Sequence, residues 1–220
     1  MNKQLFFFDP NEFSTRRNTT REEFIKMIEP EASKILNLMD RSFHEMVTRR
    51  DERRTYSITP NWCPVEMNAN IRGNLVDTYG VQKVNPKDTI VEVGRNERFY
   101  LNLAGKFKIY FKKLDKYHQP RNILTKNDYL IKNQLSDNSE DVNPNIFIGY
   151  TVNKHWNKIT GIYAVKLVGT TDKEWEIDLN LLVANKQPLA KNISLNSKSK
   201  ELNQKPLVKI KKGLKRKKAE

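Results

Sequence analysis

The segment from Lys106 to Lys112 alternates between apolar and polar side chains, and this pattern constrains the fold more than any other part of the chain. In an extended strand, successive side chains point to opposite faces. One face would carry Phe107, Ile109 and Phe111, and the other would carry Lys106, Lys108, Tyr110 and Lys112. We therefore predict a strand with an apolar face against a core and a basic, aromatic face toward solvent.

The first 80 residues have helical periodicity instead. Thr19 or Thr20 can cap a first helix, which ends near Pro30. A second helix is predicted from an apolar stripe at intervals of three and four residues, made of Ala32, Ile35, Met39, Phe43 and Met46. A third is predicted over residues 64–79, with Gly80 as its stop.

Period-two patterns then predict six strands, over residues 90–93, 98–103, 106–114, 146–152, 161–168 and 174–179. Ala104-Gly105 is the expected turn of a hairpin, and Thr125 with Asp128 resembles a capping box for a short helix. We predict an α+β fold, in which helices pack on one face of a mostly antiparallel sheet of about six strands.

The positive charge is concentrated at the C-terminus. The 220 residues carry a net charge of +14, and residues 191–220 contain 11 Lys/Arg against 2 acidic residues. We expect an N-terminal arm over residues 1–17, a single α+β domain over 18–185 with its core at 64–180, and a disordered basic tail over 186–220.

Several classes of site are not expected. Cys63 is the single cysteine, which excludes an intrachain disulfide and a cysteine-based zinc site. His44, His118 and His155 stand at no metal-ligand spacing, and no glycine-rich phosphate loop is present, so we expect neither metal nor cofactor. The lone cysteine favours a reduced, cytoplasmic setting. No window approaches 18 apolar residues, so we expect no membrane-spanning helix and no membrane contact.

The basic strand face is the first candidate nucleic-acid site. With the preceding strand it would gather Arg98, Tyr100, Lys106, Lys108, Tyr110 and Lys112, whose ammonium groups could meet phosphates and whose tyrosines could stack on bases. The alternative is a solvated outer face. A further alternative is neutralisation by the acidic row Glu174, Glu176 and Asp178, if the two rows are neighbours.

The tail is the second candidate. Its residues Lys211, Lys212, Lys215 and Arg216 belong to a dense run of cations that could bind nucleic acid without sequence preference. Disorder that merely solubilises the protein is the alternative, and in a eukaryotic host the run could act as a nuclear localisation signal.

An enzyme is less expected than a binding protein. The element order is similar to the core of the PD-(D/E)xK nucleases, but the strand over residues 98–103 has no acid and the next has none before Asp115. A catalytic site would have to be assembled from distant residues. Its mark would be a pocket that gathers His118, Glu92, Asp115 and Lys113 within hydrogen-bond reach.

The segment Lys108 to Asp115, followed by Arg121-Asn-Ile-Leu-Thr125, resembles a motif of a poorly characterised family of small bacterial and phage proteins. In that family a strand ending Phe-Lys-Lys-Leu-Asp leads into Arg-Asn-Ile-Pro-Thr, and Leu124 replaces the proline here. Gly149-Tyr150 and the closing segment from Glu174 to Leu179 are also similar, so the match spans residues 64–180.

The resemblance implies a setting in toxin–antitoxin or phage-defence loci and assigns no catalytic residue. It implies that Lys112, Lys113, Asp115, Arg121 and Asn122 act together, either around a ligand phosphate or as a turn held by local salt bridges. The leading hypothesis is a small basic protein of such a system that binds nucleic acid or a nucleic-acid machine. The alternatives are a protein-interaction module that docks a cognate partner, and an enzyme with an unrecognised site.

Overall fold

The computed structural model describes residues 13–52, 62–82, 85, 87–94, 99–120, 125–136 and 142–185. The chain divides into residues 1–187 and 188–220, and the elements below belong to the first unit. The helices are α1 (Arg21–Ile28), α2 (Ala32–Glu52), α3 (Trp62–Tyr79), α4 (Lys126–Lys132) and α5 (Leu179–Ala184). The strands are β1 (Ser14–Thr15), β2 (Ile90–Val93), β3 (Phe99–Leu103), β4 (Phe107–Lys113), β5 (Leu135–Ser136), β6 (Asn145–Val152), β7 (Ile159–Leu167) and β8 (Lys173–Asp178).

The main sheet has six strands in the order β2-β3-β4-β6-β7-β8, and β1 pairs with β5 in a separate two-stranded sheet. Every pairing in the main sheet is antiparallel except that of β4 with β6, which is parallel. The predicted α+β class and the mostly antiparallel six-stranded sheet are confirmed.

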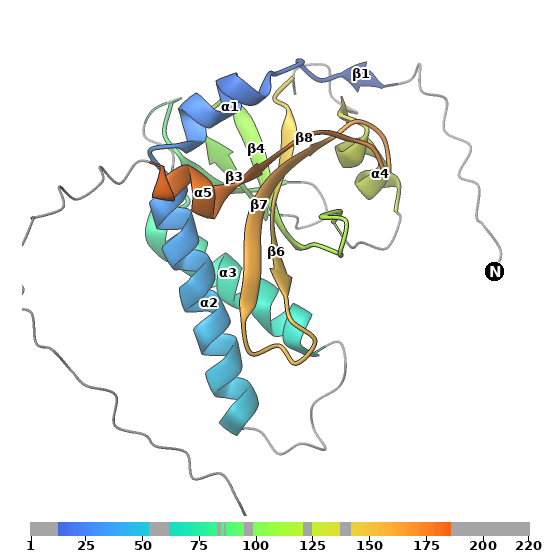
Figure 1. Ribbon diagram of the computed structural model, residues 1–220. Coiled ribbons are helices and arrows are strands. Elements are labelled where there is room, and N and C mark those ends of the chain that lie inside the picture. The colour runs from blue at the N-terminus through green and yellow to red at the C-terminus, as the bar shows by residue number, and fades with distance from the viewer. Residues whose placement is uncertain are drawn as a thin grey trace, which may run out of the picture. The chain divides into compact units, whose positions relative to one another are not determined.

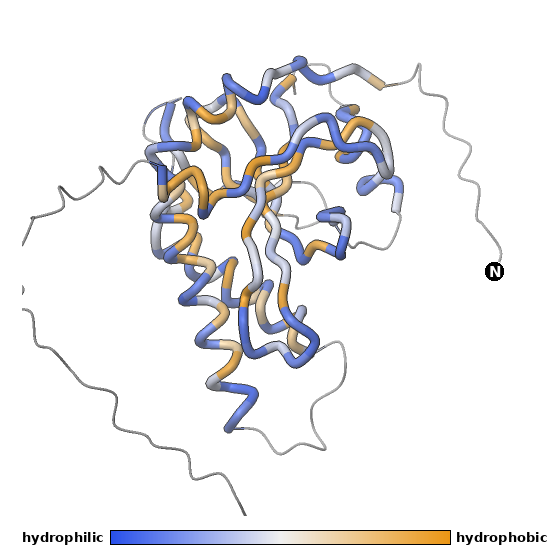
Figure 2. The backbone as a smooth tube through the Cα atoms, viewed as in Figure 1, coloured by the Kyte–Doolittle hydropathy of each residue, from blue (hydrophilic) through white to orange (hydrophobic). Residues whose placement is uncertain are grey.

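One face of the sheet carries the larger core. Helices α1, α2, α3 and α5 lie on this side (Figure 1), and Figure 2 shows hydrophobic and hydrophilic residues alternating along the turns of α2. The predicted stripe of α2 is buried throughout, and it meets the apolar side chains Phe107, Ile109 and Phe111 of β4. The prediction that the apolar face of β4 packs against a core is therefore confirmed. None of the helices in the described ranges is both long enough and apolar enough to cross a membrane.

The opposite face of the sheet is also covered. Tyr100 and Tyr110 belong to a second apolar cluster, together with Ile131 of α4 and Phe147 of β6. Their exposed fractions are 7% and 9%, so the expectation of a solvent-facing tyrosine surface is wrong. The physical reason is that α4 lies against this face, apart from the other helices (Figure 1). The two tyrosines are therefore part of a buried core and are not available for stacking on a ligand.

Local expectations at the turns and caps are confirmed. Thr20 accepts a hydrogen bond from the backbone N–H of Glu23 and caps α1, and Thr125 accepts one from Asp128 and caps α4. Ala104 and Gly105 have φ angles of 51° and 70° in the β3–β4 hairpin. Two consecutive positive φ angles are the conformation that a tight hairpin turn requires.

The sequence patterns did not predict β1, β5 or α5, or the strong anchoring of the N-terminal segment. The buried ammonium group of Lys166 in β7 contacts Asn18 Oδ1 at 2.7 Å, the backbone oxygen of Thr19 at 3.0 Å and Glu174 Oε2 at 2.8 Å. Arg16 donates to the backbone oxygens of Leu135 and Asn143. These bonds fasten the chain ahead of α1 to the sheet.

Two glycines allow side chains to lie directly on the sheet. A Cβ at Gly149 would collide with the Leu114 side chain, and one at Gly161 would collide with the Tyr163 ring. Gly149 and Tyr163 are direct partners across β6 and β7. The absence of a side chain at these two positions makes room for Leu114 and Tyr163.

We predict that Gly149→Ala lowers the free energy of unfolding by about 1–3 kcal/mol, because Leu114 must leave its buried position. The matched control is Gly73→Ala in α3, where the added methyl group meets nothing within 4 Å. That change should stabilise the helix by about 0.5–1 kcal/mol. Urea unfolding of both variants measures the two effects, and equal effects would contradict the proposed contact.

We predict that Glu174→Gln destabilises the fold by about 1–3 kcal/mol, since the Lys166 ammonium group is 2% exposed and loses its charged partner. Glu52→Gln at the exposed end of α2 serves as the control and should change stability by less than about 0.5 kcal/mol. Thermal unfolding at neutral pH compares them, and similar melting temperatures would contradict the role assigned to Glu174.

Candidate binding cleft

A cleft of about 640 Å³ lies where β4 ends. The end of β4 and the turn that follows form one side, and the facing parts of β6 and β7 form the other. Its lining consists of Lys113, Leu114, Asp115, Lys116, Tyr117, His118, Thr151, Val152, Thr160 and Tyr163. The volume falls in the range of sites that hold small organic ligands.

The turn after β4 is shaped by Asp115. One carboxylate oxygen, Oδ1, accepts hydrogen bonds from the backbone N–H groups of Tyr117 at 2.8 Å and Gln119 at 2.9 Å. The backbone N–H of His118 donates to the backbone oxygen of Asp115 at 3.0 Å. His118 thereby adopts a φ of 57°, a left-handed conformation that costs free energy for any residue with a side chain. The turn closes where Leu114 and Pro120 form an isolated β-bridge.

The imidazole ring of His118 is stacked on Tyr163. Their centroids are 3.9 Å apart and their planes differ by 20°. Tyr163 can lie flat at this place because Gly161, two residues before it in β7, has no Cβ. Burial, and after it the negative charges of Asp178 and Glu176, raise the pKa of Tyr163, so its phenol stays neutral around pH 7.

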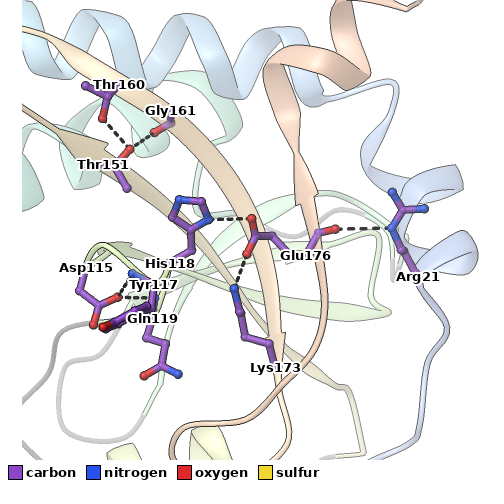
Figure 3. A network of polar contacts seen from close by, with 10 residues as sticks. All are labelled: Arg21, Asp115, Tyr117, His118, Gln119, Thr151, Thr160, Gly161, Lys173 and Glu176. Carbon is purple, nitrogen blue, oxygen red and sulfur yellow. Dashed lines mark hydrogen bonds and ion pairs between the residues drawn. The ribbon is translucent and has the colours of Figure 1, made fainter.

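A carboxylate holds the same ring from the side. Nδ1 of His118 lies 2.7 Å from Oε1 of Glu176 in β8, and Nζ of Lys173 lies 2.6 Å from the other oxygen, Oε2 (Figure 3). Burial raises the pKa of Glu176, but hydrogen bonds from Lys173 and His118 outweigh it, and the net pKa is lowered. Glu176 is therefore ionised near neutral pH and can only accept hydrogen bonds.

The structure brings one member of the predicted nucleic-acid set, Lys113, into the cleft. Lys106 is exposed in the β3–β4 turn, Lys108 lies 4.9 Å from the centroid of the Tyr100 ring, and Lys112 is half-buried. The predicted residues Arg98, Arg121, Lys211, Lys212, Lys215 and Arg216 lie outside the described residues, as does Asn122.

The acidic row of β8 does not pair with the lysine row of β4. Strands β6 and β7 stand between them in the sheet, which separates the rows by three strand spacings, or about 14 Å. Each acid has a nearer partner. Glu174 binds Lys166, Glu176 binds His118 and Lys173, and Asp178 caps α5 by accepting from the N–H groups of Asn180 and Leu181.

Four polar residues were expected within hydrogen-bond reach of one another in a pocket; three of them share the cleft lining, so the expected convergence is incomplete. Lys113, Asp115 and His118 line the cleft. Glu92 does not, because it accepts hydrogen bonds from the Tyr100 hydroxyl at 2.6 Å and the Asn102 amide at 2.7 Å on the neighbouring strand. Glu176, which is not part of the cleft lining, is the carboxylate that contacts His118. Sequence reasoning missed it because it lies 58 residues from His118, with an ordinary alternating pattern around it.

Sequence reasoning also missed Lys116, Tyr117, Thr151, Thr160 and Tyr163 as cleft residues. The available indication was the polar turn that directly follows the basic strand. Among the described residues, no group of three or more His, Cys, Asp and Glu side chains could hold a metal ion. Comparison with family models, with curated proteins and with solved structures gave no match to this chain.

We predict that Glu176→Gln lowers stability by about 1–2 kcal/mol at pH 7, because two charge-assisted hydrogen bonds weaken. The pKa of Glu176 is lowered from 4.5 in the folded protein, so its contribution is present above that pH and is lost as the pH falls through the folded pKa. Chemical denaturation at a series of pH values from 7 downward should show a difference that shrinks as the pH falls through the folded pKa. A difference that is constant with pH would exclude the charged pair as its cause.

Proposed function

We propose that the protein binds single-stranded nucleic acid in this cleft, with phosphates against Lys113 and Lys116 and a base against Tyr117. The observation that carries the proposal is the lining itself, which brings two lysines and an accessible tyrosine to one cleft. The binding site of the leading hypothesis thus moves from the sheet face to the end of β4.

The geometry of Tyr117 supports base stacking. Its side chain is 63% exposed, and the ammonium group of Lys116 lies 4.7 Å from its ring centroid. An accessible ring beside a cation can hold the face of a base while the cation meets the adjacent phosphate. A duplex hides its base faces, so this arrangement favours a single strand.

The cleft walls add groups that suit a sugar. Thr160 donates a hydrogen bond to the Thr151 hydroxyl at 2.8 Å, and both threonines line the cleft. Hydroxyl groups both donate and accept, so they match the hydroxyl and ring oxygens of a ribose. The basic residues of 191–220 add affinity through charge alone, which supports the proposal without specifying a site.

We predict that Lys113→Met with Lys116→Met weakens binding of a 12-residue single-stranded oligonucleotide tenfold or more at 100 mM salt. Each lost phosphate contact should also reduce the slope of log K against log salt concentration by about 1. Tyr117→Ala should weaken binding by about 1–3 kcal/mol through lost stacking. Fluorescence anisotropy with the full chain measures both effects.

Two control variants separate the cleft from general basicity. Lys87→Met removes an exposed lysine ahead of β2, at the opposite end of the sheet from the cleft. Lys108→Met removes a lysine of the predicted sheet face. Both should keep nearly the original affinity. If they weaken binding as much as the cleft variants do, the cleft is not the site.

A further inference from the structure

The cleft holds His118 in one orientation by three separate means. Its ring is stacked on Tyr163, its Nδ1 is bonded to Glu176, and its backbone is kept at a positive φ by the Asp115 turn. A histidine that merely adds charge to a binding surface needs none of these contacts. Strained backbone conformations and fixed side chains are concentrated at catalytic sites.

The bond to Glu176 also determines which nitrogen is reactive. Because the carboxylate is ionised, it accepts, and Nδ1 must carry the hydrogen. In neutral His118 the lone pair is then on Nε2. Figure 3 shows this nitrogen on the side of the ring toward Thr151 and Thr160, two residues of the cleft lining. A histidine with one ring nitrogen bonded to a carboxylate and the other carrying a lone pair has the arrangement of a general base.

We propose that His118 is a general base that removes the proton from a ribose 2′-hydroxyl, so that the protein cleaves the RNA bound in its cleft. This inference rests on the proposed function and specifies its substrate as RNA. RNA supplies its own nucleophile beside the phosphodiester, so the reaction needs a base, an acid and positive charge near the phosphate. The cleft offers His118, Lys113 and Lys116 for these needs.

Two proton transfers accompany the exchange of bonds at phosphorus. The 2′-hydroxyl proton passes to Nε2 of His118 while the 2′-oxygen forms a bond to phosphorus. The bond from phosphorus to the 5′-oxygen breaks, and that oxygen takes a proton from the Lys113 ammonium group. The imidazolium then gives its proton to solvent and Lys113 regains one, which restores the site. The products are a 2′,3′-cyclic phosphate and a free 5′-hydroxyl.

Glu176 is a positioning residue in this scheme, and Lys173 holds it in turn. The charged groups that face His118 are Glu176 and Lys173 from β8, with the neutral phenol of Tyr163 from β7. Asp115, Lys113 and Lys116 belong to its own segment of the cleft. The carboxylate favours the imidazolium that forms when the proton is taken, in addition to fixing the ring.

The experiment uses the full chain and two 12-residue oligonucleotides of one sequence, one of RNA and one fully 2′-O-methylated. The methylated strand has no 2′-hydroxyl and reports binding alone. Cleavage of the RNA is followed by gel electrophoresis, and mass spectrometry identifies the cyclic phosphate. The variant His118→Asn is suited to the site because asparagine tolerates a positive φ. His155→Asn, in the exposed β6–β7 loop, is the matched control.

We expect cleavage with a cyclic phosphate end in the original protein and in His155→Asn. In His118→Asn cleavage should fall 100-fold or more, while binding of the methylated strand changes less than threefold. In Glu176→Gln the rate of cleavage should fall tenfold or more while binding of the methylated strand changes less than threefold, because the imidazole loses its fixed orientation. A purely structural role for Glu176 would weaken binding of the methylated strand together with the rate.

The outcomes separate this inference from the proposed function. Binding of the methylated strand without cleavage of RNA overturns the inference and leaves the binding function standing. Cleavage that is equal in His118→Asn and the original protein overturns the inference as well, since it comes from another source. Failure to bind either strand overturns both proposals.

Discussion

The parallel pairing of β4 with β6 determines most of what surrounds the cleft. Antiparallel neighbours can be joined by a tight turn, but the chain leaving β4 must return to the other end of the sheet before it can enter β6. Residues 114–144 make this return, and they carry the Asp115 turn, α4 and β5. One pairing therefore gives the sheet its second covered face and places a polar turn over the strand ends.

Two glycines shape the floor beside the cleft, one where the returning segment meets β6 and one within β7. Leu114 fills the space above Gly149, and Tyr163 lies over Gly161. His118 is then stacked on Tyr163, and Glu176 reaches it from the next strand. The histidine is thus positioned by two neighbouring strands, β7 and β8, and by a turn that belongs to neither of them.

The sequence predicted what depends on local patterns. Strand and helix locations follow from side-chain period, so the buried stripe of α2, the apolar half of β4 and both threonine caps were found. Apart from the hairpin of β3 and β4, strand order was not predicted, because period-two patterns do not specify which strand is the neighbour of which. The parallel step and the distance between the lysine and acidic rows both depend on that order.

The same limit explains the outcome at the candidate site. Tyr100 and Tyr110 alternate with apolar residues and share their side of the strand with polar ones, as exposed residues do, and only the return path of the chain shows that α4 covers them. Lysine side chains are compatible with either environment, since a long stem can lie along apolar surface while the ammonium group reaches water. Lys113, Asp115 and His118 were weighed together because they are close in sequence, whereas Glu176 becomes visible only through tertiary structure.

The positive φ of His118 has a consequence for how independent this turn is. Glycine would adopt that backbone conformation without strain, whereas histidine gives up about 1 kcal/mol or more there. The hydrogen bonds of the Asp115 turn offset part of this cost, and Tyr163 and Glu176, which are far away in the chain, offset the rest. A peptide of residues 114–120 would keep the bonds to Asp115 but lose both contacts of the imidazole ring. The orientation of that ring is therefore a property of the assembled sheet, which the turn alone does not carry.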